Sequence, residues 1–196
     1  MAQIGVKYPM YAPLIEDETS KTFEYGEGKI AGKAIRINWN LNIAESKLYA
    51  DDDVAESAKE FIDGTLGFNP DDIPQDARAD WLDNKIEKET VGAEEVDVLT
   101  STDEDNPGYF GFGFIVTKIK NNQRLYRAIL LTKVQFKEPN EETETKGQQI
   151  TWQTPNIEGT IMRRIDGAWK KEITVSSLTT AKAWLAQVLN IGGSDT

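Results

Sequence analysis

The chain has 196 residues, enough to bury a hydrophobic core and close to the size at which a single domain is expected. It contains neither cysteine nor histidine, which excludes disulfide bonds, thiol and histidine catalysis, and most transition-metal sites. The net charge is -11, and the surplus carboxylates are not gathered in one tail, so the sequence argues against tight binding of DNA phosphates.

The sequence has no pattern typical of a membrane span or of export. No apolar run approaches the roughly 20 residues that cross a bilayer. Residues 1–4 lack the basic and apolar regions of a signal peptide. We therefore expect a soluble protein that is cytoplasmic when it is made.

The N-terminal part is predicted to hold an arm, two strands and a long loop. Residues 1–15 are predicted to form the arm. Residues 35–43 alternate apolar and polar side chains, which predicts a strand with one face in water. The apolar face of this strand holds Ile35, Ile37, Trp39, Leu41 and Ile43. Residues 45–59 are predicted to be a polar loop, and connections of this length are typically functional or disordered. A second strand follows, with Ile62, Gly64, Leu66 and Phe68 on one face.

A short amphipathic helix is predicted next. Asp71 and Asp72 precede Pro74, an arrangement typical of a helix start. Apolar residues then recur at helical spacing, at Ile73, Ala77, Trp81, Leu82 and Ile86. Residues 96–99 are predicted to form a short strand beyond this helix.

The clearest predicted hairpin spans residues 109–136. Its first strand alternates bulky and small residues, with Phe110, Phe112, Phe114 and Val116 on one face. Gly111 and Gly113 lie on the other face, which indicates a core strand packed closely against another backbone. Asn121 and Asn122 predict a two-residue turn, because Asn tolerates a positive φ angle, and residues 124–136 are the returning strand.

The C-terminal part is predicted to complete an antiparallel sheet. A charged loop (138–147) precedes three predicted strands at residues 149–154, 156–164 and 169–174. Ser177 is a suitable N-cap for a helix over residues 177–190, which carries an apolar stripe and ends before two glycines. The predicted fold is therefore one mainly β (β+α) domain, an antiparallel β-sandwich or barrel with two flanking helices.

Several groups of residues are of types that can form sites of chemistry. Asp51, Asp52 and Asp53 with Glu56 resemble a calcium loop only weakly, because the spaced ligands and central glycine of an EF-hand are missing. A solvated or partner-facing acidic loop is the preferred interpretation. Other carboxylates have no spacing that defines a glycosidase pair: Asp63, Asp71, Asp72, Asp103 and Asp105. The alternating Phe and Gly residues lack both the basic surroundings of a nucleic-acid platform and the GKS or GKT of a phosphate loop. We expect no catalytic residues, no cofactor, no metal and no enzymatic activity.

Basic residues gather in two groups. They are Lys118, Lys120, Arg124 and Arg127, and Arg163, Arg164, Lys170 and Lys171. In so acidic a protein they are candidates for contact with acidic loops of another copy, and solvated strand faces explain them equally well.

Five segments in order along the chain resemble the major tail proteins of siphophages, the bacteriophages with long non-contractile tails. They are IGVKYPMYAPL (4–14), LYADDDVAE (48–56), GTL (64–66), GYFGFGF (108–114) and ITWQTP (150–155). None is a catalytic signature, so the resemblance depends on the whole set.

The resemblance implies a β-sandwich of the tail tube type that assembles with itself. Six copies would form a ring, and stacked rings would form a tube through which phage DNA passes without specific binding. The implied partners are other copies, the tail initiator, the tape measure protein and the tail terminator, and the implied location is the virion tail, assembled in the host cytoplasm. The segments carried over predict contacts between copies at Tyr8, Pro9, Tyr11, Leu48, Tyr49, Asp51, Asp52 and Asp53.

Two alternatives remain open at this point. Related folds serve as other tube or neck components, such as a tail terminator or a secretion-system tube protein, and fold alone does not separate them. A carbohydrate-binding β-sandwich with exposed Trp and Tyr and calcium-binding acidic loops is the alternative from another class.

Overall fold

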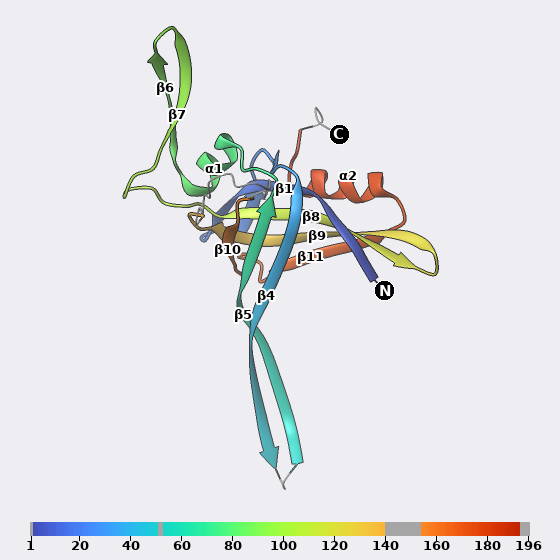
Figure 1. Cartoon of the computed structure of the whole chain (residues 1–196). Helices are drawn as coiled ribbons and strands as arrows, with labels where there is room; N and C mark the ends of the chain where they lie inside the picture. Colours follow the sequence, from blue (N-terminus) through green and yellow to red (C-terminus); the bar gives the residue numbers. More distant parts are fainter. Residues whose placement is uncertain (1, 51–52, 140–153, 193–196) are drawn as a thin grey trace, which may run out of the picture.

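The computed structural model describes residues 2–50, 53–139 and 154–192, which form strands with two helices (Figure 1). The helices are α1 (Gln75–Leu82) and α2 (Leu178–Val188). The strands are β1 (Ala2–Asp17), β2 (Thr22–Tyr25), β3 (Lys29–Ile30), β4 (Ala34–Ala50), β5 (Asp53–Pro70), β6 (Lys85–Val91), β7 (Glu94–Thr100), β8 (Phe110–Lys120), β9 (Gln123–Phe136), β10 (Ile157–Ile161) and β11 (Lys170–Val175). The predicted mainly β fold with two helices is confirmed.

The main sheet is antiparallel and folds over itself at β9. Its strand order is β2-β1-β8-β9-β10-β5-β4, with β11 paired to β9 and β3 to β1. Strand β9 pairs with β11 from Tyr126 to Leu131 and with β10 from Val134 to Phe136. One strand therefore belongs to two layers, and β4 and β5 cross β8 and β9 at a steep angle in Figure 1.

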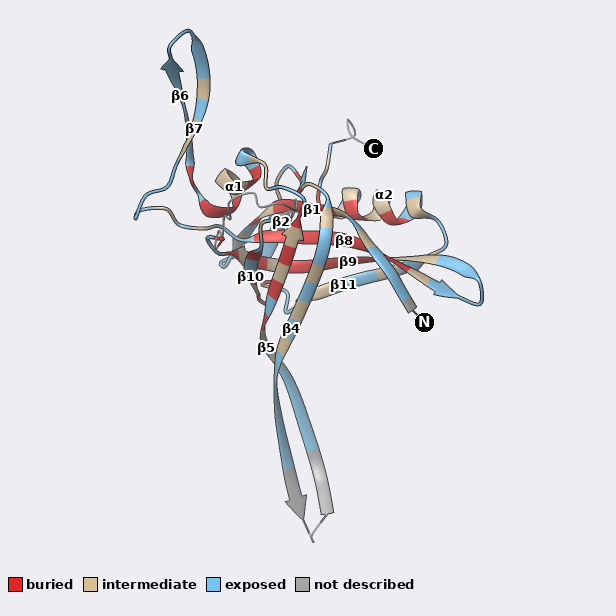
Figure 2. Ribbon diagram, viewed as in Figure 1, coloured by how far each residue is buried: buried red, intermediate tan, exposed pale blue. Residues whose placement is uncertain are grey.

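The core lies between these layers and is rich in aromatic side chains. The ring of Trp81 from α1 stacks 4.5 Å from that of Phe136, and Phe68 packs 5.2 Å from Phe112. The predicted Phe face of β8 is confirmed, since Phe110, Phe112, Phe114 and Val116 all belong to this core. Figure 2 shows that buried residues are confined to the central body.

Helix α2 covers the opposite face of β8 and β9, where a second apolar cluster is buried. Ser177 caps the helix by accepting a hydrogen bond from the backbone N–H of Thr180 at 3.3 Å, which confirms the predicted cap. A Cβ atom on Gly113 would lie only 2.8 Å from Cδ2 of Leu185. The glycine face of β8 therefore admits close packing, but against side chains of α2 instead of another backbone.

The tight turn between β8 and β9 is confirmed, with φ angles of 49° at Asn121 and 62° at Asn122.

The helix predicted after Asp72 is present as α1, but it is shorter than predicted. Asp83 adopts the left-handed conformation (φ 62°) and ends the helix, so Ile86 lies in β6 instead of on the helix.

Two predicted segments are wrong. Residues 1–15 are not a free arm, because β1 pairs with β8 from Ala2 opposite Ile119 to Pro13 opposite Phe110. Residues 45–59 are not a loop, because β4 continues to Ala50 and β5 begins at Asp53, with the two strands paired throughout. Strand β1 is not recognisable in the sequence because its register with β8 is irregular, which interrupts the alternation of side chains. The outer half of the β4–β5 hairpin is not recognisable because it lacks the apolar alternation that burial against a core produces.

The prediction of the apolar faces of β4 and β5 is confirmed for the central residues of these strands and is wrong at the ends of the predicted runs. Ile37, Trp39 and Leu41 pack on the core, but Ile35, Ile43 and Ile62 are about half exposed. The register shifts near each of these three residues, so their side chains leave the predicted face. Phe61 packs inward next to Ile62, stacked 4.8 Å from Trp169.

The remaining predicted strands fall into place with one exception. Strand β7 contains the predicted residues 96–99, β11 matches 169–174 closely, and β10 is shorter than 156–164. Almost all of the predicted strand 149–154 lies outside the described residues.

Candidate assembly surfaces

Two of the predicted contact residues are buried inside the chain. Tyr11 is fully buried, and its hydroxyl donates a 2.7 Å hydrogen bond to Oδ2 of Asp80. Pro9 is buried, and its carbonyl accepts a 2.9 Å hydrogen bond from the backbone N–H of Ala31. Because both residues support the fold, their prediction as direct contacts with another copy is wrong for this structure.

Tyr8 keeps an accessible position. It has a φ angle of 54° and is half-buried, with its ring centroid 4.3 Å from Nζ of Lys182. Tyr8 also lines a largely apolar surface pocket of about 350 Å³ between β1 and the start of β4, together with Val6, Lys7, Ile30, Gly32, Lys33 and Ala34. Of the three N-terminal candidates, Tyr8 is therefore the one positioned to touch another molecule.

The other predicted contact residues belong to the end of the β4–β5 hairpin. The backbones of Leu48 and Tyr49 pair with Glu56 and Val54, and Asp53 begins β5. Asp51 and Asp52, and the side chains of Leu48, Tyr49 and Asp53, lie outside the described part of the structure. Their predicted contacts and the calcium alternative remain predictions.

Strand β4 presents a long free edge. It has 17 residues and no proline, and within the described ranges β5 is its only ladder partner. A row of unpaired backbone N–H and C=O groups is a template for pairing with another chain, and monomeric proteins usually protect such edges. The middle of β4 carries Asn38, Asn40 and Asn42 instead of the lysines or prolines that would block pairing.

The outer half of the β4–β5 hairpin projects from the body (Figures 1 and 2). The described side chains at 43–47 and 57–60 are exposed on both strands. Nζ of Lys47 and Nζ of Lys59 lie 3.5 and 3.4 Å from the carboxylate of Glu45, and exposed pairs of this kind add little stability. Neither hydrophobic cluster includes a residue of this half among the side chains that the structure describes, so the core of the fold does not depend on them.

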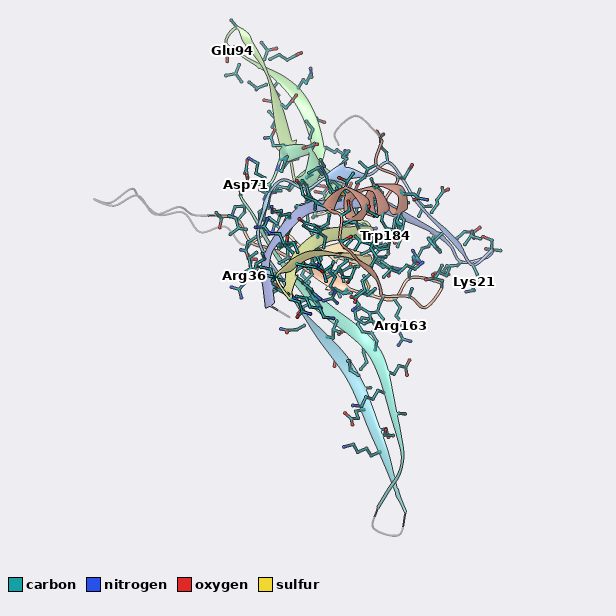
Figure 3. All side chains as sticks on the ribbon, turned by 90° about the vertical axis from the view of Figure 1, so that its right-hand side faces the viewer. Lys21, Arg36, Asp71, Glu94, Arg163 and Trp184 are labelled. Atoms are coloured by element: carbon teal, nitrogen blue, oxygen red, sulfur yellow. The ribbon has the colours of Figure 1, made fainter. Side chains whose placement is uncertain are left out.

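A second hairpin, β6–β7, extends from the body in the opposite direction. This opposition is visible in Figure 1 and again in Figure 3, where Glu94 marks its far end. All of β6 is exposed, including Ile86 and Val91. An isolated two-stranded hairpin is at best marginally stable in water, so this hairpin is a surface suited to a partner.

Two of the carboxylates considered for chemistry, Asp71 and Asp105, act as local hydrogen-bond acceptors. Oδ1 of Asp71 accepts from the backbone N–H groups of Lys33 and Asp72, and these bonds, chiefly that from Lys33, lower its pKa. Asp105 accepts from the hydroxyl and backbone N–H of Thr102 and from Asn84, which lowers its pKa. Among the described residues, no three carboxylates are grouped as metal ligands.

Buried charges also belong to the fold. The guanidinium of Arg164 is almost fully buried, pairs with Asp166 and lies 3.4 Å from the ring centroid of Phe23. Glu16 accepts hydrogen bonds from Nζ of Lys133 and from the backbone N–H of Ile165. Each of these buried charged groups has a hydrogen-bonding or ion-pair partner within the fold, and together these contacts attach β1 and β2 to the 163–168 segment.

The tryptophans that the structure describes are used for packing. Trp81 is buried, Trp39 lies 5.5 Å from Phe114, and Trp169 stacks on Phe61. Trp184 on α2 packs at the second cluster. No observation on these rings favours the carbohydrate-binding alternative.

Comparison with known proteins adds no assignment, since neither a protein-family model nor a curated protein matches this sequence. Helices α1 and α2, with 8 and 11 residues, are the helices of the described ranges, and both are too short and insufficiently apolar to cross a membrane.

Proposed function

We propose that the protein is a structural subunit that polymerises with itself into a tube, as the major tail tube protein of a long-tailed bacteriophage does. The observation that carries the proposal is the free edge of β4, which continues into a hairpin that the core does not require. In a tube of stacked rings, this edge would pair with a strand of a neighbouring copy, and the hairpin would reach across to another copy.

The order of the five resembling segments along the chain supports a tail tube over a generic polymer. Segments 4–14 and 64–66 lie in β1 and β5, and segment 108–114 runs into β8, so they belong to the sheet that the proposal uses. The net charge of -11 supports a lumen that repels phosphates, so that DNA slides through without being held. The initiator, tape measure and terminator proteins of the same tail would be its other partners.

Electron microscopy of the concentrated protein tests the proposal. We expect hollow tubes or rings with sixfold symmetry. Because a tube protein can require a nucleus, a sample with a tail initiator complex should be included. A chain that stays monomeric in both samples would overturn the proposed function.

A further inference from the structure

The two hairpins β6–β7 and β8–β9 carry opposite charges. Strands β6 and β7 hold five carboxylates and two lysines. Residues 106–137, which include all of β8 and β9, contain no carboxylate, although the chain has 33 of them. This separation within an acidic protein indicates that the hairpins are complementary surfaces.

One face of the β6–β7 hairpin combines acidic and apolar side chains, with Lys85 as its one basic residue at the base of the hairpin. The register is continuous, so residues directly opposite each other share a face: Glu87 with Val98, Glu89 with Val96, and Val91 with Glu94. Of the carboxylates on this face, none forms an ion pair with another described residue. We call these six residues the acidic face. On the other face, Glu95 pairs with Lys88 at 3.2 Å.

The tip of the β8–β9 hairpin has the opposite character. Continuous pairing places Lys118 opposite Leu125 and Lys120 opposite Gln123, all on one face. Neither lysine forms an ion pair within the described part of the chain, and Leu125 is half-buried. We call these four residues the basic face.

The two faces belong to opposite ends of the molecule. In Figure 1 the β6–β7 hairpin extends at the upper left and the β8–β9 tip at the right, beside the N-terminus. One chain therefore presents both halves of a contact but cannot join them within itself. A contact of this type is head-to-tail, and repetition of it generates a ring or a filament.

We propose that the acidic face of β6–β7 in one copy docks on the basic face of β8–β9 in a second copy. Glu87 and Glu89 meet Lys118 and Lys120, and the valines pack against Leu125. Docking packs one face of the β6–β7 hairpin against another element, which a two-stranded ribbon needs for stability. This contact deepens the proposed function, since it joins neighbouring subunits of the tube.

Charge reversal tests the electrostatic part. Glu87→Lys with Glu89→Lys, or Lys118→Glu with Lys120→Glu, should each raise the critical concentration for assembly about tenfold or more, because like charges then face each other. Mixing the two reversed chains should restore assembly, because one chain is then basic on both faces and the other acidic on both, so that they can alternate. Combining all four changes in one chain should also return the critical concentration toward the wild-type value.

Matched controls separate the contact from net charge. Glu95→Lys with Asp97→Lys changes the other face of the same hairpin, and Lys21→Glu with Lys137→Glu changes exposed lysines elsewhere. Both pairs should assemble at a critical concentration within about twofold of the wild type, since their charges lie outside the contact. If the two charge-reversed chains and the two control chains all assembled at the same critical concentration, the proposed contact would be overturned and the proposed function would remain intact.

Crosslinking provides a readout that does not depend on tubes. The chain has no cysteine, so Val91→Cys and Leu125→Cys chains can be mixed and treated with a short bismaleimide. We expect a covalent heterodimer, and a several-fold lower yield when Thr90→Cys, on the other face, replaces Val91→Cys. Equal yields would overturn the contact. A specific heterodimer without tubes would retain the contact and count against the proposed tube.

Discussion

The hydroxyl of Tyr11 on β1 donates a hydrogen bond to Oδ2 of Asp80 on α1, joining residues 69 positions apart at 2.7 Å. The same oxygen accepts from Nζ of Lys29 at 2.6 Å. Burial, followed by the bond to Asp80, raises the pKa of Tyr11, so its hydroxyl stays a donor throughout the accessible pH range. Through Asp80, the N-terminal strand is fixed to the helix that supplies Trp81 to the core.

Tyr11→Phe should lower the free energy of unfolding by about 1–2 kcal/mol, because it removes a buried hydrogen bond to a carboxylate and keeps the ring. Urea denaturation measures this loss, and Tyr109→Phe, at an exposed ring, is the control with an expected change below about 0.5 kcal/mol. Since Tyr11 is a residue of the fold, folded Tyr11→Phe protein should assemble as the wild type does. Failure of the folded variant to assemble would return Tyr11 to the contact surface.

Gly28 lies where the backbone passes directly beside the residues that follow α2. A Cβ atom at this position would lie 2.2 Å from the carbonyl oxygen of Leu189 and 2.6 Å from Cγ1 of Ile191. Gly28→Ala should therefore destabilise the protein by about 1–3 kcal/mol, because the backbone after α2 must move. Gly5→Ala is the matched control, since nothing lies within 4 Å of its Cβ position. Equal urea midpoints for the two variants would contradict the close approach.

The sequence predicted those elements whose side-chain pattern is imposed by a core. The alternation from Phe110 to Val116 reflects burial of one face against α1 and the other layer, so its strand could be read directly. The same holds for Ile37, Trp39 and Leu41, and for the capped helix after Ser177. The sequence pattern at these residues predicts the structure because each packs against other apolar side chains, so apolar positions recur with the period of the strand or helix.

The missed features are those that no core dictates. Pairing continues beyond Ala44 on β4 although both faces are exposed, so polar residues there carry no periodic signal. The left-handed Tyr8 and the bulge at Ile62 each shift a strand by one residue, which reverses the faces that alternation predicts. The opposed acidic and basic hairpin faces depend on strand pairing, and the sequence showed only the basic residues.

Glu172 should make the protein sensitive to acid. Hydrogen bonds from Arg127 and then Lys170 lower its pKa from 4.5 to about 2. Because the unfolded chain binds this proton near pH 4.5 and the folded protein near pH 2, the stabilisation is complete above about pH 5 and is lost as the pH falls through this interval. The carboxylate is partly exposed, which limits the contribution to about 1 kcal/mol.

Urea denaturation of the wild type and Glu172→Gln between pH 7 and pH 2.5 measures this dependence. We expect the difference in unfolding free energy to be largest at pH 7 and to shrink steadily below pH 4.5. Glu158→Gln changes an exposed residue that forms no ion pair within the described ranges, so it should follow the wild type at every pH. A difference for Glu172→Gln that is constant with pH would contradict the ion pair.

The β4–β5 hairpin can be shortened without disturbing the body, because Ala44 and Glu60 lie directly opposite each other. Replacing residues 45–59 with Asn-Gly closes the strands at that pair through a tight turn. Since no described side chain of this segment belongs to either hydrophobic cluster, the free energy of unfolding should change by less than about 1 kcal/mol. Tubes should be lost, because the part that would reach another copy is gone.

Placing Asn-Gly at Gly92-Ala93 of the other hairpin controls for the new turn and should leave assembly unchanged. Tubes of normal length and abundance from the shortened chain would show that this projection is not needed for polymerisation, and would shift the proposed contacts to the free edge of β4 alone.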